Sequence, residues 1–291
     1  MSINQSITYE ETHTASSQKK PIRLQEYGIG IFTTTPTKSA LKKVLKKQLI
    51  VVNGIIASTA TFIKGGETIQ LIESPGKNKK QLDFPLEVLY EDEYLAVVNK
   101  PSGILVSGNS FKTIDNALTQ NLKKSNQPDT VRPRPVHRLD YPTTGVLVIG
   151  KTRASILALN KLFENKEITK TYFAVVIGEL ESKGSIDSLV DKKEALSYYE
   201  VIQTVPSPRF KYLNLVKLFP KTGRRHQLRN HLANIGNPIL GDKEYGKEGL
   251  ILNGKGIYLH AYSLEFTHPF TKEAIYIEDK LPQKFLKLFH Q

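Results

Sequence analysis

The sequence has no cysteine in its 291 residues. This absence excludes disulfide bonds, thiol catalysis and thiolate metal sites, and it is compatible with a reducing compartment. Long apolar runs are missing too, because no stretch approaches the roughly 18 to 20 residues that cross a bilayer. The N-terminal residues are polar and partly acidic, unlike a signal or transit peptide. We therefore expect a cytoplasmic protein without membrane contact.

Positive charge is present in excess. The 41 lysines and arginines outnumber 28 aspartates and glutamates, which gives a formal net charge of +13 at pH 7. Such a chain is attracted to polyanions, because each neutralised phosphate releases condensed counterions. Charge alone leaves a nucleic-acid partner about as probable as none, since many basic soluble proteins bind no nucleic acid.

Composition divides the chain into a small and a large domain. Residues 1–21 are polar and hold few large apolar side chains, so we predict a flexible tail. Residues 75–82 combine proline, glycine and lysine, which is typical of a linker. The compact domains are therefore expected over 22–74 and 83–291.

The small domain begins with a basic amphipathic helix at 39–48, followed by an apolar strand and an Asn53–Gly54 turn. This order resembles an S4-type RNA-binding domain, although Gln25 stands where that domain usually has aspartate. The resemblance implies that the helix faces an RNA backbone with its lysines, namely Lys42, Lys43 and Lys46. The alternative is an ordinary α+β subdomain whose lysines are simply solvated.

The large domain alternates apolar strand runs with helix patterns. Strands are predicted near 88–106, 145–152, 170–178, 212–219 and 256–266, and helices near 154–166 and 226–236. Short turns rather than regular helical crossovers join several strands. We therefore predict an α+β fold whose central sheet is mixed but largely antiparallel, with flanking helices.

A carboxylate stands among cations in the stretch 134–152. His137 and Arg138 precede Asp140, in a proline-rich loop that leads into an apolar strand. Neighbouring cations favour the ionised form of a carboxylate, which suits a nucleophile or base. A structural ion pair is an equally good interpretation of Asp140 on chemistry alone.

The helix near 226–236 supplies a candidate partner for that carboxylate. Arg225 and Arg229 are four residues apart, so both are expected on one helical stripe, and Arg229 is the candidate partner of Asp140. His226 and His231 are five apart and lack the glutamate of a zinc-peptidase helix, so no metal site is expected.

Two residues of predicted strands are further candidates. Tyr172 lies two residues after Lys170 on the same side of a strand, where its ring can stack on an unpaired base for about 1 to 3 kcal/mol. Leu259 is a candidate lining residue. For both, packing in the core is an equally good interpretation.

Five ordered motifs of the large domain resemble the RluA-type family of pseudouridine synthases. They read E-D-x-x-x-x-V-x-x-K-P-x-G, H-R-L-D-x-x-T-[ST]-G, K-x-Y-x-A-x-V-x-G, G-R-x-H-Q-[IL]-R-x-H-L and L-H-A, at 91–103, 137–145, 170–178, 223–232 and 259–261. The resemblance implies that 83–291 is a catalytic domain that isomerises uridine in structured rRNA or tRNA. Neither a metal nor a cofactor is implied.

The resemblance also implies roles for individual residues. Asp140 would be the nucleophile, Arg229 its ion-pair partner, Tyr172 the stacking residue for the target uracil, and Arg138 a contact to the displaced nucleotide. His137, Leu259 and Arg225 complete the expected substrate-binding set. The sequence does not choose between attack on the sugar, attack on the ring and a glycal route.

Two other functions remain open at this stage. A non-catalytic RNA-binding or ribosome-assembly protein would explain the charge and the small domain, but it would not need Asp140, Tyr172 and Arg229 together. Hydrolysis of an N-glycosidic bond requires a second carboxylate, for which Asp242 is the nearest candidate. A monomer is the expected state of the protein.

Overall fold

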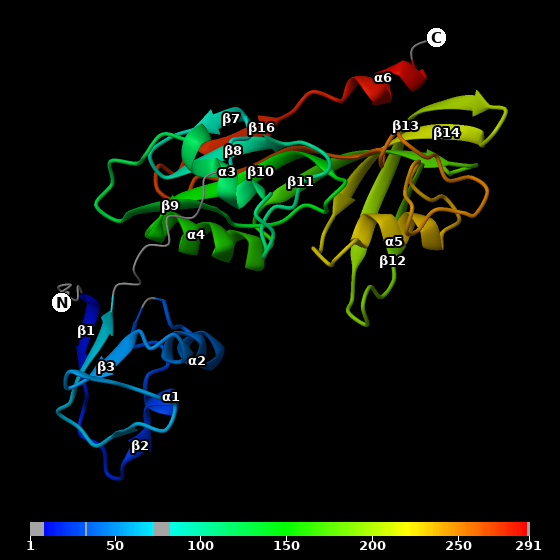
Figure 1. The fold of residues 1–291 in the computed structure, drawn as a ribbon. Coiled ribbons are helices and arrows are strands. Elements are labelled where there is room, and N and C mark those ends of the chain that lie inside the picture. The colour runs from blue at the N-terminus through cyan, green and yellow to red at the C-terminus, as the bar shows by residue number, and fades with distance from the viewer. Residues whose placement is uncertain (1–8, 33, 73–81, 290–291) are drawn as a thin grey trace. The chain divides into compact units, whose positions relative to one another are not determined.

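A computed structural model describes residues 9–32, 34–72 and 82–289 (Figure 1). The chain divides into two compact units, unit 1 over Met1–Lys79 and unit 2 over Lys80–Gln291. Most of the predicted linker at 75–82 lies outside the described residues. None of the described helices has the length and hydropathy of a bilayer-spanning segment.

Unit 1 contains small sheets and two short helices. Its helices are α1 (Leu24–Tyr27) and α2 (Lys38–Lys46), and its strands are β1 (Tyr9–Thr14), β2 (Ile22–Arg23), β3 (Ile50–Val52), β4 (Ile55–Ile56), β5 (Phe62–Ile63) and β6 (Thr68–Ile72). One sheet has the order β1-β6-β3-β4, and β2 pairs with β5. The Asn53–Gly54 turn between β3 and β4 has positive φ at both residues, as a tight hairpin requires.

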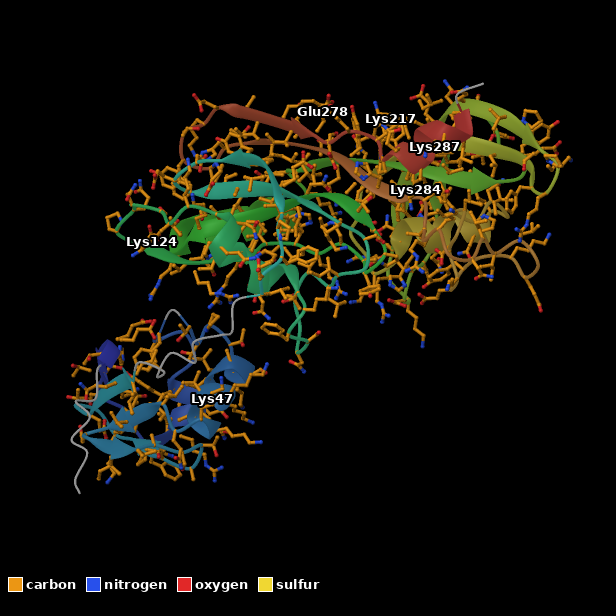
Figure 2. All side chains as sticks on the ribbon, turned by 45° about the horizontal axis from the view of Figure 1, so that its top comes forward. Lys47, Lys124, Lys217, Glu278, Lys284 and Lys287 are labelled. Atoms are coloured by element: carbon orange, nitrogen blue, oxygen red, sulfur yellow. The ribbon has the colours of Figure 1, made fainter. Side chains whose placement is uncertain are left out.

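The basic helix of unit 1 is present. Leu41 and Leu45 of α2 are buried, and Thr37 caps the helix by accepting a hydrogen bond from the Ala40 N–H. The lysines of its polar face are exposed, as is Lys47, which directly follows the helix and is labelled in Figure 2.

The prediction of a flexible tail over 1–21 is wrong for residues 9–14. These residues form β1, which pairs antiparallel with β6. The segment is polar, but main-chain hydrogen bonding to a neighbouring strand does not need an apolar side-chain pattern. Residues 1–8 lie outside the described residues.

Unit 2 is built on one 10-stranded sheet. Its strands are β7 (Glu87–Glu91), β8 (Leu95–Lys100), β9 (Thr130–Pro135), β10 (Thr144–Thr152), β11 (Thr169–Ile177), β12 (Lys183–Asp187), β13 (Leu196–Ser207), β14 (Lys211–Pro220), β15 (Leu259–Thr267) and β16 (Ala274–Glu278). The order is β12-β13-β14-β11-β15-β10-β8-β7, with β9 on β10 and β16 on β15. The fold is α+β with a mixed, largely antiparallel sheet, as predicted.

Four helices accompany the sheet in the described part of unit 2. They are α3 (Ile114–Asn121), α4 (Arg153–Glu164), α5 (Gln227–Asn234) and α6 (Gln283–Phe289). Figure 1 shows α4 and α5 on one side of the sheet and α6 on the other. Two core clusters result, one around β8 and β10 and one around β11 and β14.

The strand β15 joins these two halves in the middle of the sheet. It runs antiparallel to β11 and parallel to β10, where Thr144 pairs with His260 and Gly145 with Ala261. A Cβ on Gly145 would collide with the Ala261 carbonyl, and the φ of Gly145 is +112°. Only glycine allows this close approach, which places the start of β10 directly beside β15.

Candidate active site

A pocket of about 550 Å³ lies in unit 2, bordered by the end of α4 and the start of α5. All of the large-domain residues predicted for the site line this pocket: His137, Arg138, Asp140, Tyr172, Arg225, Arg229 and Leu259. Two strands, one helix and two loops contribute them, so the pocket exists only in the folded sheet.

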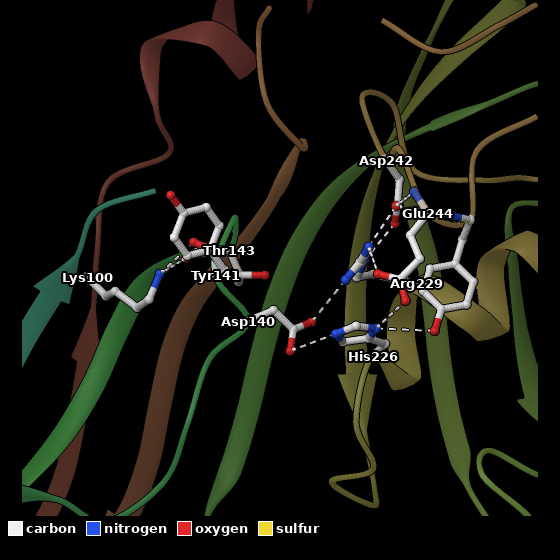
Figure 3. A network of polar contacts seen from close by, with 9 residues as sticks. Lys100, Asp140, Tyr141, Thr143, His226, Arg229, Asp242 and Glu244 are labelled. Atoms are coloured by element: carbon white, nitrogen blue, oxygen red, sulfur yellow. Dashed lines mark hydrogen bonds and ion pairs between the residues drawn. The ribbon is translucent and has the colours of Figure 1, made fainter. Parts of the chain in front are cut away.

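Asp140 lies in the loop between β9 and β10, and 17% of its side chain is exposed. The loop turns tightly, with the Thr143 N–H donating to the Asp140 carbonyl. Lys100, at the end of β8, is buried and its Nζ donates to the carbonyls of Tyr141 and Thr143 at 3.2 and 2.7 Å. The loop that carries Asp140 is therefore held by a side chain from a neighbouring strand (Figure 3).

Lys100 belongs to the motif at 91–103, but the sequence alone predicts no role for it. Burial lowers the pKa of Lys100 to about 8, and the nearby charge of Asp140 opposes that shift. A lysine at the end of the apolar run LAVVN was the available signal, because a buried lysine needs carbonyl or carboxylate partners.

Arg229 lies between three carboxylates. Its Nε and Nη2 form a fork on Asp242 at 2.7 and 2.8 Å, and Nη2 also donates to Glu244 at 3.1 Å. The remaining Nη1 lies 3.7 Å from Asp140 Oδ2 (Figure 3). The structure thus brings Arg229 to Asp140, but the closest partner of Arg229 is Asp242.

The two hydrogen bonds between Arg229 and Asp242 shift the pKa values of both groups. Burial disfavours the charged form of Arg229, but the hydrogen bonds and charge of Asp242, with the charges of Asp140 and Glu244, outweigh burial and raise its pKa. Burial likewise raises the pKa of Asp242, yet Arg229 and two main-chain N–H groups lower it by more. Both groups are therefore ionised, and Arg229 has a fixed direction.

The fork also decides the role of Asp242. Its Oδ1 accepts from the N–H groups of Glu244 and Tyr245 as well as from Arg229, and its side chain is fully buried. An acid committed to four hydrogen bonds is not available to act on a substrate. The geometry argues against Asp242 as the second carboxylate of a hydrolase.

His226 also lines the pocket, although the sequence motifs predict no catalytic or binding role for it. Its Nε2 lies 3.7 Å from Asp140 Oδ1, and its Nδ1 lies 3.3 Å from Glu244 Oε1. His231 is elsewhere, with its ring nitrogens next to Ser197 Oγ and the Ser188 carbonyl. The two histidines do not share a face of α5.

Arg225 precedes α5 rather than belonging to it, because the helix begins at Gln227 after His226. The predicted helical stripe through Arg225 and Arg229 is therefore wrong at its first residue. Arg225 is exposed and lines the pocket rim, as does Arg138. Their side chains are accessible to an anionic ligand.

His137 anchors the loop between β9 and β10 through contacts to β10 and α4. Its Nε2 accepts a hydrogen bond from the Val148 N–H at 3.0 Å, and its ring stacks on Phe163 at 4.5 Å. Burial, followed by the charge of Lys170, lowers the pKa of His137 to about 3. The imidazole is therefore neutral, and only part of its surface faces the pocket.

Tyr172 and Leu259 line the wall of the pocket formed by the sheet. Burial, with the charge of Asp140, raises the pKa of Tyr172, so the phenol stays protonated. Leu259 is 3% exposed and begins β15. The two side chains give the pocket an aromatic and aliphatic wall beside a carboxylate.

The rim of the pocket is basic. Besides Arg229, six cationic side chains line it: Arg138, Lys166, Lys170, Lys221, Arg224 and Arg225. Among the residues that the structure describes, Asp140 and Glu164 are the acids that line it. Such a rim suits a phosphate backbone around a single buried carboxylate.

Comparisons with known proteins agree with this geometry. The RNA pseudouridylate synthase family matches residues 94–234. The protein named ribosomal large subunit pseudouridine synthase D from Vibrio cholerae is 30% identical, over 96% of this chain and 94% of its own length. The tRNA pseudouridine synthase C of Haemophilus influenzae is 35% identical, over 71% of this chain and 97% of its own.

Solved structures give the same fold. Human RNA pseudouridylate synthase domain containing 4 aligns with a TM-score of 0.56 at 26% identity, over 69% of this chain and 90% of its own.

Proposed function

The chain belongs to the RluA-type family of RNA pseudouridine synthases, and on that premise we propose that Asp140 is the nucleophile of its isomerase reaction. The proposal is supported by the position of Asp140, which is one of two acids among the described residues that line the pocket, and by Arg229 Nη1 at 3.7 Å from its Oδ2. The fork on Asp242 keeps that Nη1 directed at Asp140.

The reaction explains why such a pocket is needed. Pseudouridine forms when the N1–C1′ bond of uridine breaks, the uracil turns, C5 bonds to C1′, the C5 proton leaves and N1 gains a proton. Atoms balance without an oxidant, a reductant or a metal. Attack by Asp140 and removal of a sugar proton by Asp140 both require an ionised carboxylate with an accessible oxygen.

The walls of the pocket supply the contacts that hold a flipped uridine and keep water out. A uridine in a stem must flip out, which costs a few kcal/mol. Stacking on Tyr172 and phosphate contacts from Arg138 and Arg225 offset that cost. Leu259 excludes water, which would otherwise attack C1′ and leave an abasic site.

The substrate we propose is a structured RNA, with large-subunit rRNA ahead of tRNA. The relative whose name specifies the large ribosomal subunit matches 96% of this chain, whereas the tRNA relative matches 71%. We propose that Lys42, Lys43 and Lys46 of unit 1 add RNA contacts through an S4-like domain at 22–74. We further propose a cytoplasmic monomer that requires no cofactor.

A pseudouridine map of total RNA tests the proposal. We would compare a strain lacking the gene with the same strain carrying the wild type, Asp140→Ala or Asp140→Asn. One or a few sites should vanish in the deletion and return only with the wild type. Return of the sites with either variant would exclude Asp140 as nucleophile, and the identity of the sites distinguishes rRNA from tRNA.

A further inference from the structure

His226 faces Asp140 from the same side as Arg229, next to the other carboxylate oxygen (Figure 3). The two oxygens of Asp140 have different neighbours, since Oδ1 lies 3.7 Å from His226 Nε2 and Oδ2 lies 3.7 Å from Arg229 Nη1 (Figure 3). Both distances exceed a hydrogen bond by under 1 Å. Contacts of this kind commonly shorten when substrate binds.

The ring of His226 is fixed on its far side. Nδ1 lies 3.2 Å from the Tyr245 hydroxyl and 3.3 Å from Glu244 Oε1. The ring also meets the Tyr245 ring edge-on, with centroids 5.7 Å apart. With 11% of its side chain exposed, His226 has little freedom to turn away from Asp140.

The local backbone does not explain why a histidine occupies this position. His226 is the residue before α5, and its φ and ψ of 54° and 21° lie in the left-handed region. Glycine or asparagine adopts that region more easily, and serine, threonine or aspartate caps a helix better. The side chain of His226 makes no capping hydrogen bond. A strained residue that does not cap its helix indicates a role for the side chain itself.

We propose that His226 is a positioning residue that holds Asp140 through Oδ1 while Arg229 holds it through Oδ2. Two donors three residues apart then fix the plane of the carboxylate, and Asp140 reaches the flipped nucleotide in one orientation. The inference rests on the proposed role of Asp140. Glu244 and Tyr245 contact the His226 ring as Asp242 contacts Arg229, and Glu244 contacts both His226 and Arg229.

The test is steady-state and single-turnover kinetics of the full chain on an RNA transcript that contains the mapped site. His226→Ala should lower kcat by about 100-fold with little change in KM, because misorientation of a reacting group slows chemistry rather than binding. His226→Gln keeps an N–H donor near the Nε2 position and should restore much of that loss.

Two comparisons make the outcome decisive. His231→Gln changes a histidine of α5 that contacts Ser197 and Ser188 instead of Asp140, and it should lower the melting temperature while leaving kcat unchanged. An unchanged kcat in His226→Ala, a loss confined to KM, or an equal loss in the Ala and Gln variants would overturn the proposal. Activity in Asp140→Asn would instead refute the role of Asp140, independently of His226.

Discussion

The lysines of α2 in unit 1 and the arginine of α5 in unit 2 carry the same charge in opposite settings. Lys42, Lys43 and Lys46 are exposed, whereas Arg229 is 6% exposed and lies among three carboxylates. Exposed charge attracts a polyanion over a distance and is screened by salt. A buried guanidinium that makes two hydrogen bonds to one carboxylate points in one direction, and its charge is screened little by salt. The exposed lysines of unit 1 are therefore suited to attracting a polyanion. The buried Arg229 is suited to orienting Asp140.

Asp242→Asn should have the largest effect of the changes considered, because it removes the ion pair that fixes the direction of Arg229. Arg229 would keep its buried charge but lose its fork, and removing one partner of a buried ion pair costs about 3 kcal/mol. We expect that loss in the free energy of unfolding measured by urea denaturation. Activity should fall as well, because Nη1 would no longer be aimed at Asp140.

Glu244→Gln is the matched control for that prediction. Glu244 makes one 3.1 Å contact to Arg229 from a side chain that is 52% exposed. An exposed ion pair contributes at most about 1 kcal/mol. Equal destabilisation by the two substitutions would show that the fork on Asp242 is not what fixes Arg229.

His137→Gln tests how the stability of unit 2 depends on pH. The pKa of His137 is lowered from 6.5 to about 3, so between these values only the unfolded chain takes up the proton. The stability of unit 2 is therefore complete above pH 6.5 and falls on acidification, by about 1.4 kcal/mol per pH unit for one proton. A glutamine at 137 still offers an acceptor to the Val148 N–H but does not titrate.

The measurement is urea denaturation of both proteins at pH 7, 6 and 5. The slope of unfolding free energy against pH should be shallower in His137→Gln. Parallel slopes would contradict a neutral, buried His137.

Replacing Lys42, Lys43 and Lys46 of α2 by glutamine should give the smallest effect. Each lysine that contacts a phosphate contributes about −0.7 to −0.9 to the slope of log affinity against log salt, so the triple variant should lose about 2 units. RNA binding measured from low to moderate salt checks this. Lys19→Gln with Lys20→Gln alters exposed charge in the same unit outside α2 and should change the slope less.

The sequence predicted most of the central sheet, because β8, β10, β11, β14 and β15 are runs of buried apolar residues. It did not predict β9, since Pro133 and Pro135 argue against a strand, yet β9 pairs on one side only, with β10. The strand β13 was also missed. The half of β13 nearer its C-terminal end is largely exposed and lacks an apolar pattern.

The membership of the pocket was predictable from motifs, but its contacts were not. Asp140, Tyr172, Arg229 and Leu259 were named in advance, and they share one pocket. The fork of Arg229 on Asp242 depends on where the chain returns after α5, and no spacing rule specifies that path. The direction of His226 depends on a left-handed backbone conformation that histidine adopts only occasionally.

The central position of β15 has a consequence for the order of folding. Asp140 precedes β10 and Tyr172 lies on β11, but the strand that joins β10 to β11 begins only at Leu259. Pairings over such sequence separations form slowly. During synthesis, about 120 residues must follow Asp140 before its pocket has a wall, and until then the two halves are open sheets with unpaired edges. We expect hydrogen exchange to show β15 closing last.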